Sequence, residues 1–157
     1  MRNRTAGFSL VELLVILGII GILVAIAIPT SNRGTLNLVS SVTEFEANVR
    51  IARGNSTGRG VHYRLTLYSN YYEVDRLHLN AGAWVHDPLF SVQTISLPPT
   101  VTIITGAGQS FEFNSRGLLQ SASPGVPAAQ VNVALHDSKT SETKTVGIWP
   151  SGQIIGS

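Results

Sequence analysis

The sequence predicts an α+β protein in which a long N-terminal helix packs on a mostly antiparallel β-sheet head. Three observations support this prediction: an apolar run near the N-terminus, an amphipathic helical pattern after it, and short β-branched or aromatic segments over the rest of the chain. With 157 residues, 43% hydrophobic and 13% charged, the chain is neither disordered nor long enough for two full enzyme domains. The absence of cysteine excludes disulfides, thiolate zinc sites and iron–sulfur clusters.

The first expected element is the apolar run from Phe8 to Ile28, in which Glu12 is the only charged residue and which Pro29 follows. As a helix, its 21 residues would be about 31 Å long, close to the thickness of the hydrocarbon core of a bilayer. Arg2 and Arg4 precede the run, and this charge bias keeps the N-terminus in the cytoplasm. The run is therefore expected to cross a membrane once, with the head outside.

Other interpretations of this run remain open. A plain membrane anchor explains the length but not Glu12, because a carboxylate costs about 2.5 to 3.5 kcal/mol at the middle of a membrane. A secretory signal would account for Ala25, Ile26 and Ala27, which imitate an A-x-A cleavage site. However, the run is longer than the roughly 7 to 15 residues of a signal core, and it carries a charge.

The residues around position 7 favour a third interpretation. Gly7 to Leu13, with the letters GFSLVEL, follow a short basic leader and closely resemble the type IV prepilin signature. The resemblance implies cleavage after Gly7 by a membrane prepilin peptidase, N-methylation of Phe8, and a role for Glu12 in filament assembly. Pro29 is the 22nd residue after that cut, where pilins commonly have a helix-kinking proline.

The same resemblance implies where the chain resides. Residues 1–7 would be the leader, and the mature protein would first lie in the bacterial inner membrane with its head in the periplasm. It would then join other pilin or pseudopilin subunits in a filament, with an inner-membrane assembly platform and the lipid bilayer as further partners. The pilin fold, a long helix with a globular head, agrees with the fold class given above.

Glu12 has a physical role in this interpretation. Cleavage leaves a cationic amine on Phe8 at the end of an apolar helix, where an unpaired charge is strongly disfavoured. The Glu12 carboxylate of a neighbouring subunit would neutralise this amine and fix the register between the helices. Pairing within one chain is also open, because Glu12 lies one helical turn from Phe8.

The amphipathic pattern begins beyond Pro29. Apolar residues recur there at steps of four and three, namely Leu38, Val42, Phe45, Val49 and Ala52. Gly54 is expected to end this helix, so one helix, broken or softened around Pro29 to Gly34, is predicted over residues 8–53. Its stripe is expected to pack on the first sheet of the head.

The head is predicted over residues 61–157, after a turn-rich stretch from Gly54 to Gly60. Eight short segments have the composition of strands and are separated by turn residues. They run from Val61 to Ser69, Tyr71 to Leu79, Val92 to Leu97, Val101 to Thr105, Ser110 to Asn114, Gln130 to Leu135, Thr143 to Trp149 and Gln153 to Ile155.

This order of elements, with FEFNSRG from Phe111 to Gly117, resembles the GspH/FimT group of minor pilins and type II secretion pseudopilins. Nucleic acid is possible as a partner but is not favoured. The last hairpin of that group often ends in a Gly-Arg-Val element, whereas this chain has the residues SGQI at 151–154. Without Arg2 and Arg4 the chain has nine basic and nine acidic side chains. It therefore lacks the net positive charge that attracts the phosphates of nucleic acid.

No enzyme, metal site or cofactor is predicted. Gly54 to Gly58 match G-x-S-x-G, but a nucleophile elbow needs a strand before it and a helix after it, the reverse of the order here. The chain has four histidines, His62, His78, His86 and His136. They show no metal-ligand spacing and no carboxylate partner at short range. The sequence thus predicts a filament subunit. The alternative is a membrane-anchored or secreted binding domain with a coincidental prepilin-like N-terminus.

Overall fold

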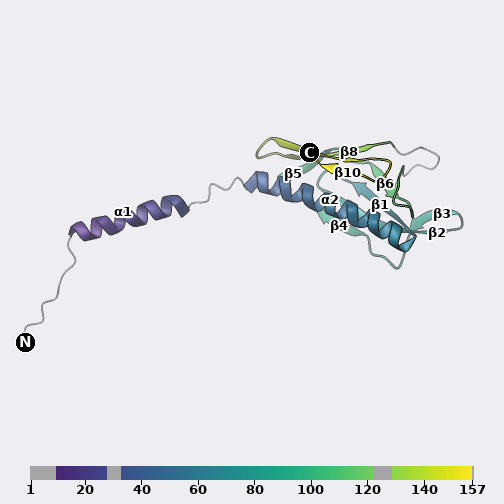
Figure 1. Cartoon of the computed structure of the whole chain (residues 1–157), viewed down its shortest axis with the longest axis horizontal. Coiled ribbons are helices and arrows are strands. Elements are labelled where there is room, and N and C mark those ends of the chain that lie inside the picture. Colours follow the sequence, from purple (N-terminus) through teal and green to yellow (C-terminus); the bar gives the residue numbers. More distant parts are fainter. Residues whose placement is uncertain (1–9, 28–32, 122–128, 157) are drawn as a thin grey trace, which may run out of the picture. The chain divides into compact units, whose positions relative to one another are not determined.

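The structure is a computed structural model, and it describes residues 10–27, 33–121 and 129–156. Its internal contacts divide the chain into two units, Met1–Asn32 and Arg33–Ser157. The first unit contains helix α1, Leu10–Ala27, and the second contains helix α2, Arg33–Arg59, with two antiparallel sheets (Figure 1). The α+β class predicted from the sequence is confirmed.

Helix α1 consists almost entirely of apolar residues and has 18 residues, which corresponds to about 27 Å. No helix in the described part of the chain is long and apolar enough to cross a membrane. Residues 8, 9 and 28 of the membrane span predicted over residues 8–28 lie outside the described residues, so that span stays a prediction.

The larger sheet has six strands in the order β3-β2-β1-β6-β7, and β4 also pairs with β2. Alternation along β1 places Tyr63, Leu65 and Leu67 in the core and turns Arg64 and Thr66 to the opposite face. The bounds of these strands are β1 His62–Leu67, β2 Tyr71–Asn80, β3 Ala83–His86, β4 Gln93–Ser96, β6 Ser110–Phe113 and β7 Leu119–Ser121.

The smaller sheet has four strands in the order β10-β9-β8-β5. Val133 and Leu135 of β8 and Val146 and Ile148 of β9 are fully buried, which makes these two strands the apolar centre of the sheet. The bounds are β5 Val101–Thr105, β8 Val131–Asp137, β9 Glu142–Ile148 and β10 Ile154–Gly156.

The apolar stripe of α2 is the centre of the core. Its five predicted members are all buried, and α2 contacts strands of both sheets rather than the first sheet alone. The rings of Phe45 and Tyr72 meet edge to face at 5.1 Å, and Asn48 Nδ2 donates a hydrogen bond to Tyr72 Oη at 2.8 Å. Burial raises the pKa of Tyr72 to about 12, so its hydroxyl keeps its proton at neutral pH.

The predicted end of the helix at Arg53 is wrong, because α2 continues through Gly54 to Arg59. Ser56 is fully buried and its hydroxyl donates to the carbonyl of Arg53 at 2.7 Å, while the Thr57 hydroxyl donates to that of Gly54 at 2.9 Å. Ser56 is the one buried residue of this last stretch, and its packing with these two hydrogen bonds opposes the cost of a glycine in a helix, about 1 kcal/mol for each of Gly54 and Gly58. The helix ends instead at Arg59 and is followed by Gly60, whose φ of 65° is the left-handed conformation that commonly terminates a helix.

All eight predicted strands are present with ends shifted by a few residues, and the structure adds β3 and β7. The turn before β3 has positive φ at Ala81 and Gly82, the pattern of a two-residue type I′ hairpin. Alanine is uncommon at such a position, which is why the sequence gives no clear hairpin signal there. Strand β7 has only three residues, too few for a periodic pattern.

Phe45→Asp should lower the free energy of unfolding of a fragment of residues 31–157 by several kcal/mol, because it buries an unpaired charge among apolar side chains. That loss is comparable with the whole stability of a small domain, about 5–15 kcal/mol. Thermal unfolding followed by circular dichroism measures it. Ala47→Asp, on the exposed side of the same helix, is the control, and equal midpoints for both variants would contradict the packing of this stripe.

Candidate functional site

The residues predicted to direct processing and assembly lie at the N-terminal end of the chain. Gly7, Phe8 and Pro29 fall outside the described residues. Glu12 lies within α1. The roles assigned to these four residues stay predictions.

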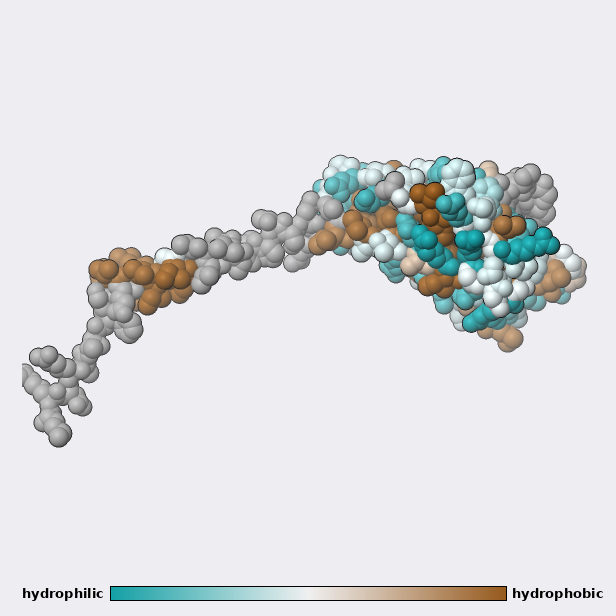
Figure 2. Space-filling model, in the orientation of Figure 1, coloured by the Kyte–Doolittle hydropathy of each residue, from teal (hydrophilic) through white to brown (hydrophobic). Residues whose placement is uncertain are grey.

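The described side chains of α1 form an apolar surface on every side of the helix. At 3.6 residues per turn, the apolar residues between positions 10 and 20 cover the whole circumference, and Figure 2 shows their atoms in brown. A helix that is apolar all round is stable when it is buried, in a lipid environment or among other helices. The exposed members are Leu10, Val11, Leu13, Leu14, Val15, Ile16, Leu17, Ile19 and Ile20.

The C-terminal end of α2 is tied to two turns of the head. Arg53 donates from Nε to the carbonyl of Gly117 at 3.1 Å and from Nη2 to that of Ser151 at 3.3 Å. A Cβ at Gly117 would lie 2.7 Å from Thr57, and one at Gly152 would collide with the Gly117 carbonyl. Only glycine allows the helix and both turns to approach this closely.

The FEFNSRG segment therefore does more than form a hairpin. Asn114 Oδ1 accepts hydrogen bonds from the backbone N–H groups of Arg116 and Leu118, at 2.9 and 3.1 Å. This Asx turn places Gly117 against α2, and the N–H of Leu119 then donates to the carbonyl of Pro150 at 3.0 Å. The segment joins the two sheets at the end of the helix.

A buried polar cluster lies on the face of the larger sheet that points away from α2. Arg64 donates to Glu112 Oε1 from Nε at 2.8 Å and from Nη2 at 2.6 Å, and His62 Nδ1 lies 3.7 Å from Glu112 Oε2. The imidazole of His62 stacks on Trp84 of β3, with ring centroids 3.5 Å apart. Burial lowers the pKa of His62, and the nearby Glu112 carboxylate opposes that shift.

The expectation that the histidines lack carboxylate partners is wrong for His62 and for His86. His86 Nδ1 lies 2.7 Å from Asp75 Oδ1 across β2 and β3. His136 instead contacts the hydroxyl of Thr143 at 3.1 Å. In the described ranges no group of three or more histidine, aspartate or glutamate side chains is arranged to hold a metal ion.

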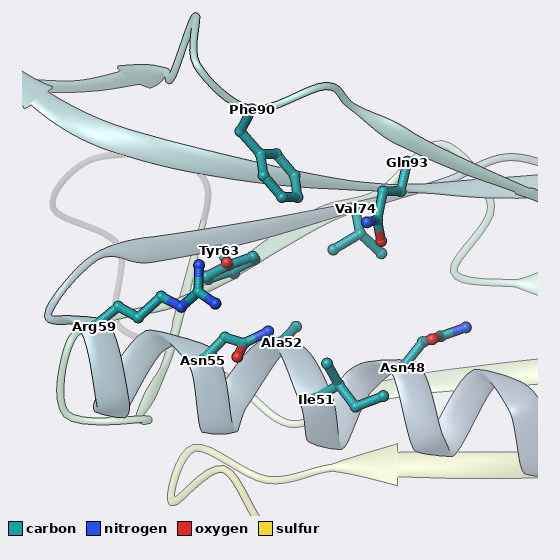
Figure 3. Close-up of a pocket in the computed structure, with 9 residues that line it drawn as sticks. All are labelled: Asn48, Ile51, Ala52, Asn55, Arg59, Tyr63, Val74, Phe90 and Gln93. Carbon is teal, nitrogen blue, oxygen red and sulfur yellow. The ribbon is translucent and has the colours of Figure 1, made fainter.

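A groove of about 210 Å³ lies between α2 and β4, and sequence reasoning did not identify it (Figure 3). Its floor is apolar, whereas its rims carry three carboxamides and one guanidinium. A shallower cavity of about 440 Å³ lies on the other side of α2, beside Lys144 of β9 and Gly156 of β10. The residues that line the groove are Asn48, Ile51, Ala52, Asn55, Arg59, Tyr63, Val74, Phe90 and Gln93.

Comparison with known protein families matches residues 2–28 to the prokaryotic N-terminal methylation motif. A comparison with curated protein sequences found no match. The motif covers the predicted cleavage and methylation residues, Gly7 and Phe8, together with Glu12. The prepilin-like character of the N-terminus is thus confirmed.

Solved structures share the fold of the chain. The minor pseudopilin EpsH of the type 2 secretion system of Vibrio cholerae superposes with a TM-score of 0.58 and 10% identity, covering 77% of this chain and 96% of EpsH. The type IV minor pilin FimU of Pseudomonas aeruginosa superposes with a TM-score of 0.56 and 19% identity, covering 81% of this chain and 91% of FimU. The predicted pilin fold is confirmed.

The stability of the head should fall as the pH drops through about 6.5, the ordinary pKa of histidine. Because the pKa of His62 is lowered in the folded state, the unfolded state binds more protons in this range, and the free energy of unfolding decreases as the pH decreases. Urea unfolding on either side of that pH should show a smaller change for His62→Gln than for the wild type. His136→Gln is the control, and identical pH dependence in all three proteins would contradict the role of His62.

Proposed function

We propose that this chain is a minor pilin or pseudopilin, a structural subunit of a type IV pilus or of a type II secretion pseudopilus. The observation that carries the proposal is the presence of the N-terminal methylation motif and the pilin fold in one chain. Each of the two solved structures that share the fold is named as such a subunit, so the fold alone does not distinguish the two kinds of filament.

In this proposal a prepilin peptidase cuts after Gly7, and the new N-terminal residue Phe8 is methylated. A small residue before the cut suits a peptidase pocket that closes tightly around the chain. The product is a helix whose first residue carries a cationic amine and whose following residues are almost entirely apolar. Glu12 supplies the one carboxylate near that amine.

Before assembly, the chain resides in the inner membrane through its apolar N-terminal segment, with its head in the periplasm. During assembly, α1 moves from lipid to the apolar interior of the filament, next to other subunits and with the help of the membrane platform. The exposed apolar surface of α1 supports this step, because lipid chains and packed helices are both apolar surroundings. Pairing of the Phe8 amine with Glu12 then avoids a lone charge in that interior.

The two helices have different tasks in this proposal. The apolar stripe of α2 is covered by the head and is not available to other subunits. Outside that stripe, α2 retains Leu36 and Val39, whose side chains are exposed. Contacts with neighbouring subunits would therefore use α1 and this outer side of α2, which leaves the sheets and loops free to contact other proteins.

Gly7→Val should leave the seven-residue leader on the protein when it is expressed with a prepilin peptidase, because a branched side chain does not fit a pocket built for glycine. Intact-mass spectrometry distinguishes an N-terminus at Met1 from methylated Phe8. Thr5→Val, which places the same side chain farther from the cut, should be processed normally. A normal mature mass for Gly7→Val would contradict the assignment, and a wild-type N-terminus at Ile28 would indicate a cleaved secretory signal.

Glu12→Ala should leave the protein in the membrane but lower its incorporation into filaments by at least about tenfold, because removing one partner of a buried ion pair costs about 3–5 kcal/mol. Quantitative immunoblots of sheared filaments and of membranes measure both pools beside wild-type partner subunits. Ser9→Ala serves as a control in the same segment. Full incorporation of Glu12→Ala would show that the carboxylate has no role in assembly.

A further inference from the structure

We propose that His62, Trp84 and Glu112 form an acid-sensitive latch, which holds strand β3 against the outer face of the larger sheet at neutral pH and releases it when His62 takes up a proton. The outer face is the face of this sheet that points away from α2. The latch belongs to the folded head, so it can be measured on the monomer and does not depend on filament assembly.

Strand β3 is a short edge strand with little buried surface. It has four residues, and in the described part of the chain it is paired on one side only, with β2. Ala83, Val85 and His86 are exposed, and Trp84 is partly buried. Segments with few buried apolar contacts open locally at a small cost in free energy. The contact made by Trp84 therefore decides how firmly β3 is held.

The ring stack of His62 and Trp84 crosses over strand β2. The two residues are on β1 and β3, which lie on opposite sides of β2 and thus about 10 Å apart, two strand spacings. Their ring centroids are nevertheless 3.5 Å apart, with the ring planes 12° from parallel. Leu77 of β2 is paired directly with His62, so it points to the same face, and it is fully buried there. The stack therefore covers Leu77.

The site is unfavourable for a protonated imidazole. His62 and Glu112 are both more than nine-tenths buried, and His62 Nδ1 has no hydrogen-bond partner in the described part of the chain. Glu112 Oε2 lies 3.7 Å from Nδ1, beyond hydrogen-bond distance. An imidazolium has two N–H donors, so protonation adds a charge and a donor where the protein offers Nδ1 no acceptor in reach.

The neighbouring charges do not compensate for this cost. Glu112 already accepts two hydrogen bonds from Arg64 through Oε1, so an imidazolium at His62 would share one carboxylate with a guanidinium. The titratable side chains next to the stack on β2 and β3 are Asp75 and His86, which pair with each other at 2.7 Å. Burial lowers the pKa of His62, and the Glu112 carboxylate only partly opposes that shift.

Opening of β3 removes this penalty. When Trp84 leaves the ring of His62, water reaches the imidazole and can hydrate its charged form. The open state then binds the proton more tightly than the closed state, and by linkage acid raises the population of the open state. Release also uncovers Leu77 beside Leu79, which is already exposed, so the head presents a larger apolar surface in acid than at neutral pH.

One interaction has the opposite sign. The face of an indole attracts a cation, so an imidazolium that stayed in place would be held more tightly by Trp84. We expect the lost hydration to prevail because the side chain of His62 is only 7% exposed. The direction in which acid changes the hold on β3 is thus the decisive observation.

The test measures amide hydrogen exchange by NMR in isotope-labelled full-length protein in detergent micelles, at about pH 7.5 and about pH 4.5. Protection factors remove the pH dependence of the chemical exchange step. Amides of β3 report the latch, and amides of β9 in the smaller sheet report unfolding of the whole head. Acid should lower the protection of β3 at least about tenfold more than that of β9.

Fluorescence gives a second, independent measurement of the same opening. The chain has two tryptophans, so Trp149→Phe, a conservative change in the other sheet, leaves Trp84 as the sole indole. Its emission should move to longer wavelength over the pH range in which β3 loses protection, because the indole enters water.

Three variants assign the response to one proton site. His62→Phe retains a ring to stack on Trp84 but cannot be protonated, so β3 should stay protected at both pH values. His62→Gln also cannot be protonated and should show no acid response, which covers the case that phenylalanine disturbs the packing. His86→Gln removes the neighbouring histidine and should respond like the wild type. Protection of β9 at neutral pH verifies that each variant is folded.

Four results would overturn the proposal. They are an unchanged protection of β3 in acid, a higher one, a loss equal to that of β9, and an acid response that persists in both His62→Phe and His62→Gln. The second would show that attraction to the indole prevails, and the last would assign the response to the carboxylates of this face. Processing and filament incorporation are measured separately, so failure here leaves the proposed function standing.

Discussion

The contact on which the rest of the structure depends is the packing of one apolar stripe of α2 against both sheets. Phe45 and Val49 are fully buried in it, and α2 contacts strands of both sheets. Because each sheet has an apolar face that needs a partner, the helix acts as the shared core of the two layers. The contact is completed near the C-terminal end of the helix, where Arg53 donates a hydrogen bond to the carbonyl of Gly117. The two turns can approach the helix this closely because Gly117 and Gly152 have no side chains.

This use of α2 determines which surfaces are left for other molecules. A helix cannot present the same stripe to its own head and to a neighbouring subunit, so the surfaces available for assembly are α1 and the outer side of α2. Helix α1 has no polar face apart from Glu12, and it is suited to apolar surroundings of either kind, lipid or packed helices. The proposed pairing of the Phe8 amine with Glu12 adds direction to an otherwise non-directional apolar contact.

The polar features of the head fall into two groups with different consequences. Arg64 donates two hydrogen bonds to Glu112 on one face of the larger sheet, where the buried Nδ1 of His62 has no hydrogen-bond partner and its ring stacks on Trp84 of β3. Arg59, by contrast, has no partner in the described part of the chain and lies exposed at the end of α2, beside a groove of mixed polar and apolar lining. The first group stabilises the fold at neutral pH, and the second leaves a cation in contact with solvent.

The sequence by itself determined the features that depend on neighbouring positions: the apolar run, the α2 stripe, the eight alternating strands and the prepilin-like residues at Gly7, Phe8 and Glu12. Tertiary structure decided the rest, because it depends on contacts between distant residues. Arg64 and Glu112 meet across 48 positions, and no local pattern announces that pair. Burial of Ser56 carries α2 past Gly54, where local propensity alone predicts a stop. The groove beside α2 requires a helix, three strands and a loop at once, so it exists only when the chain is folded.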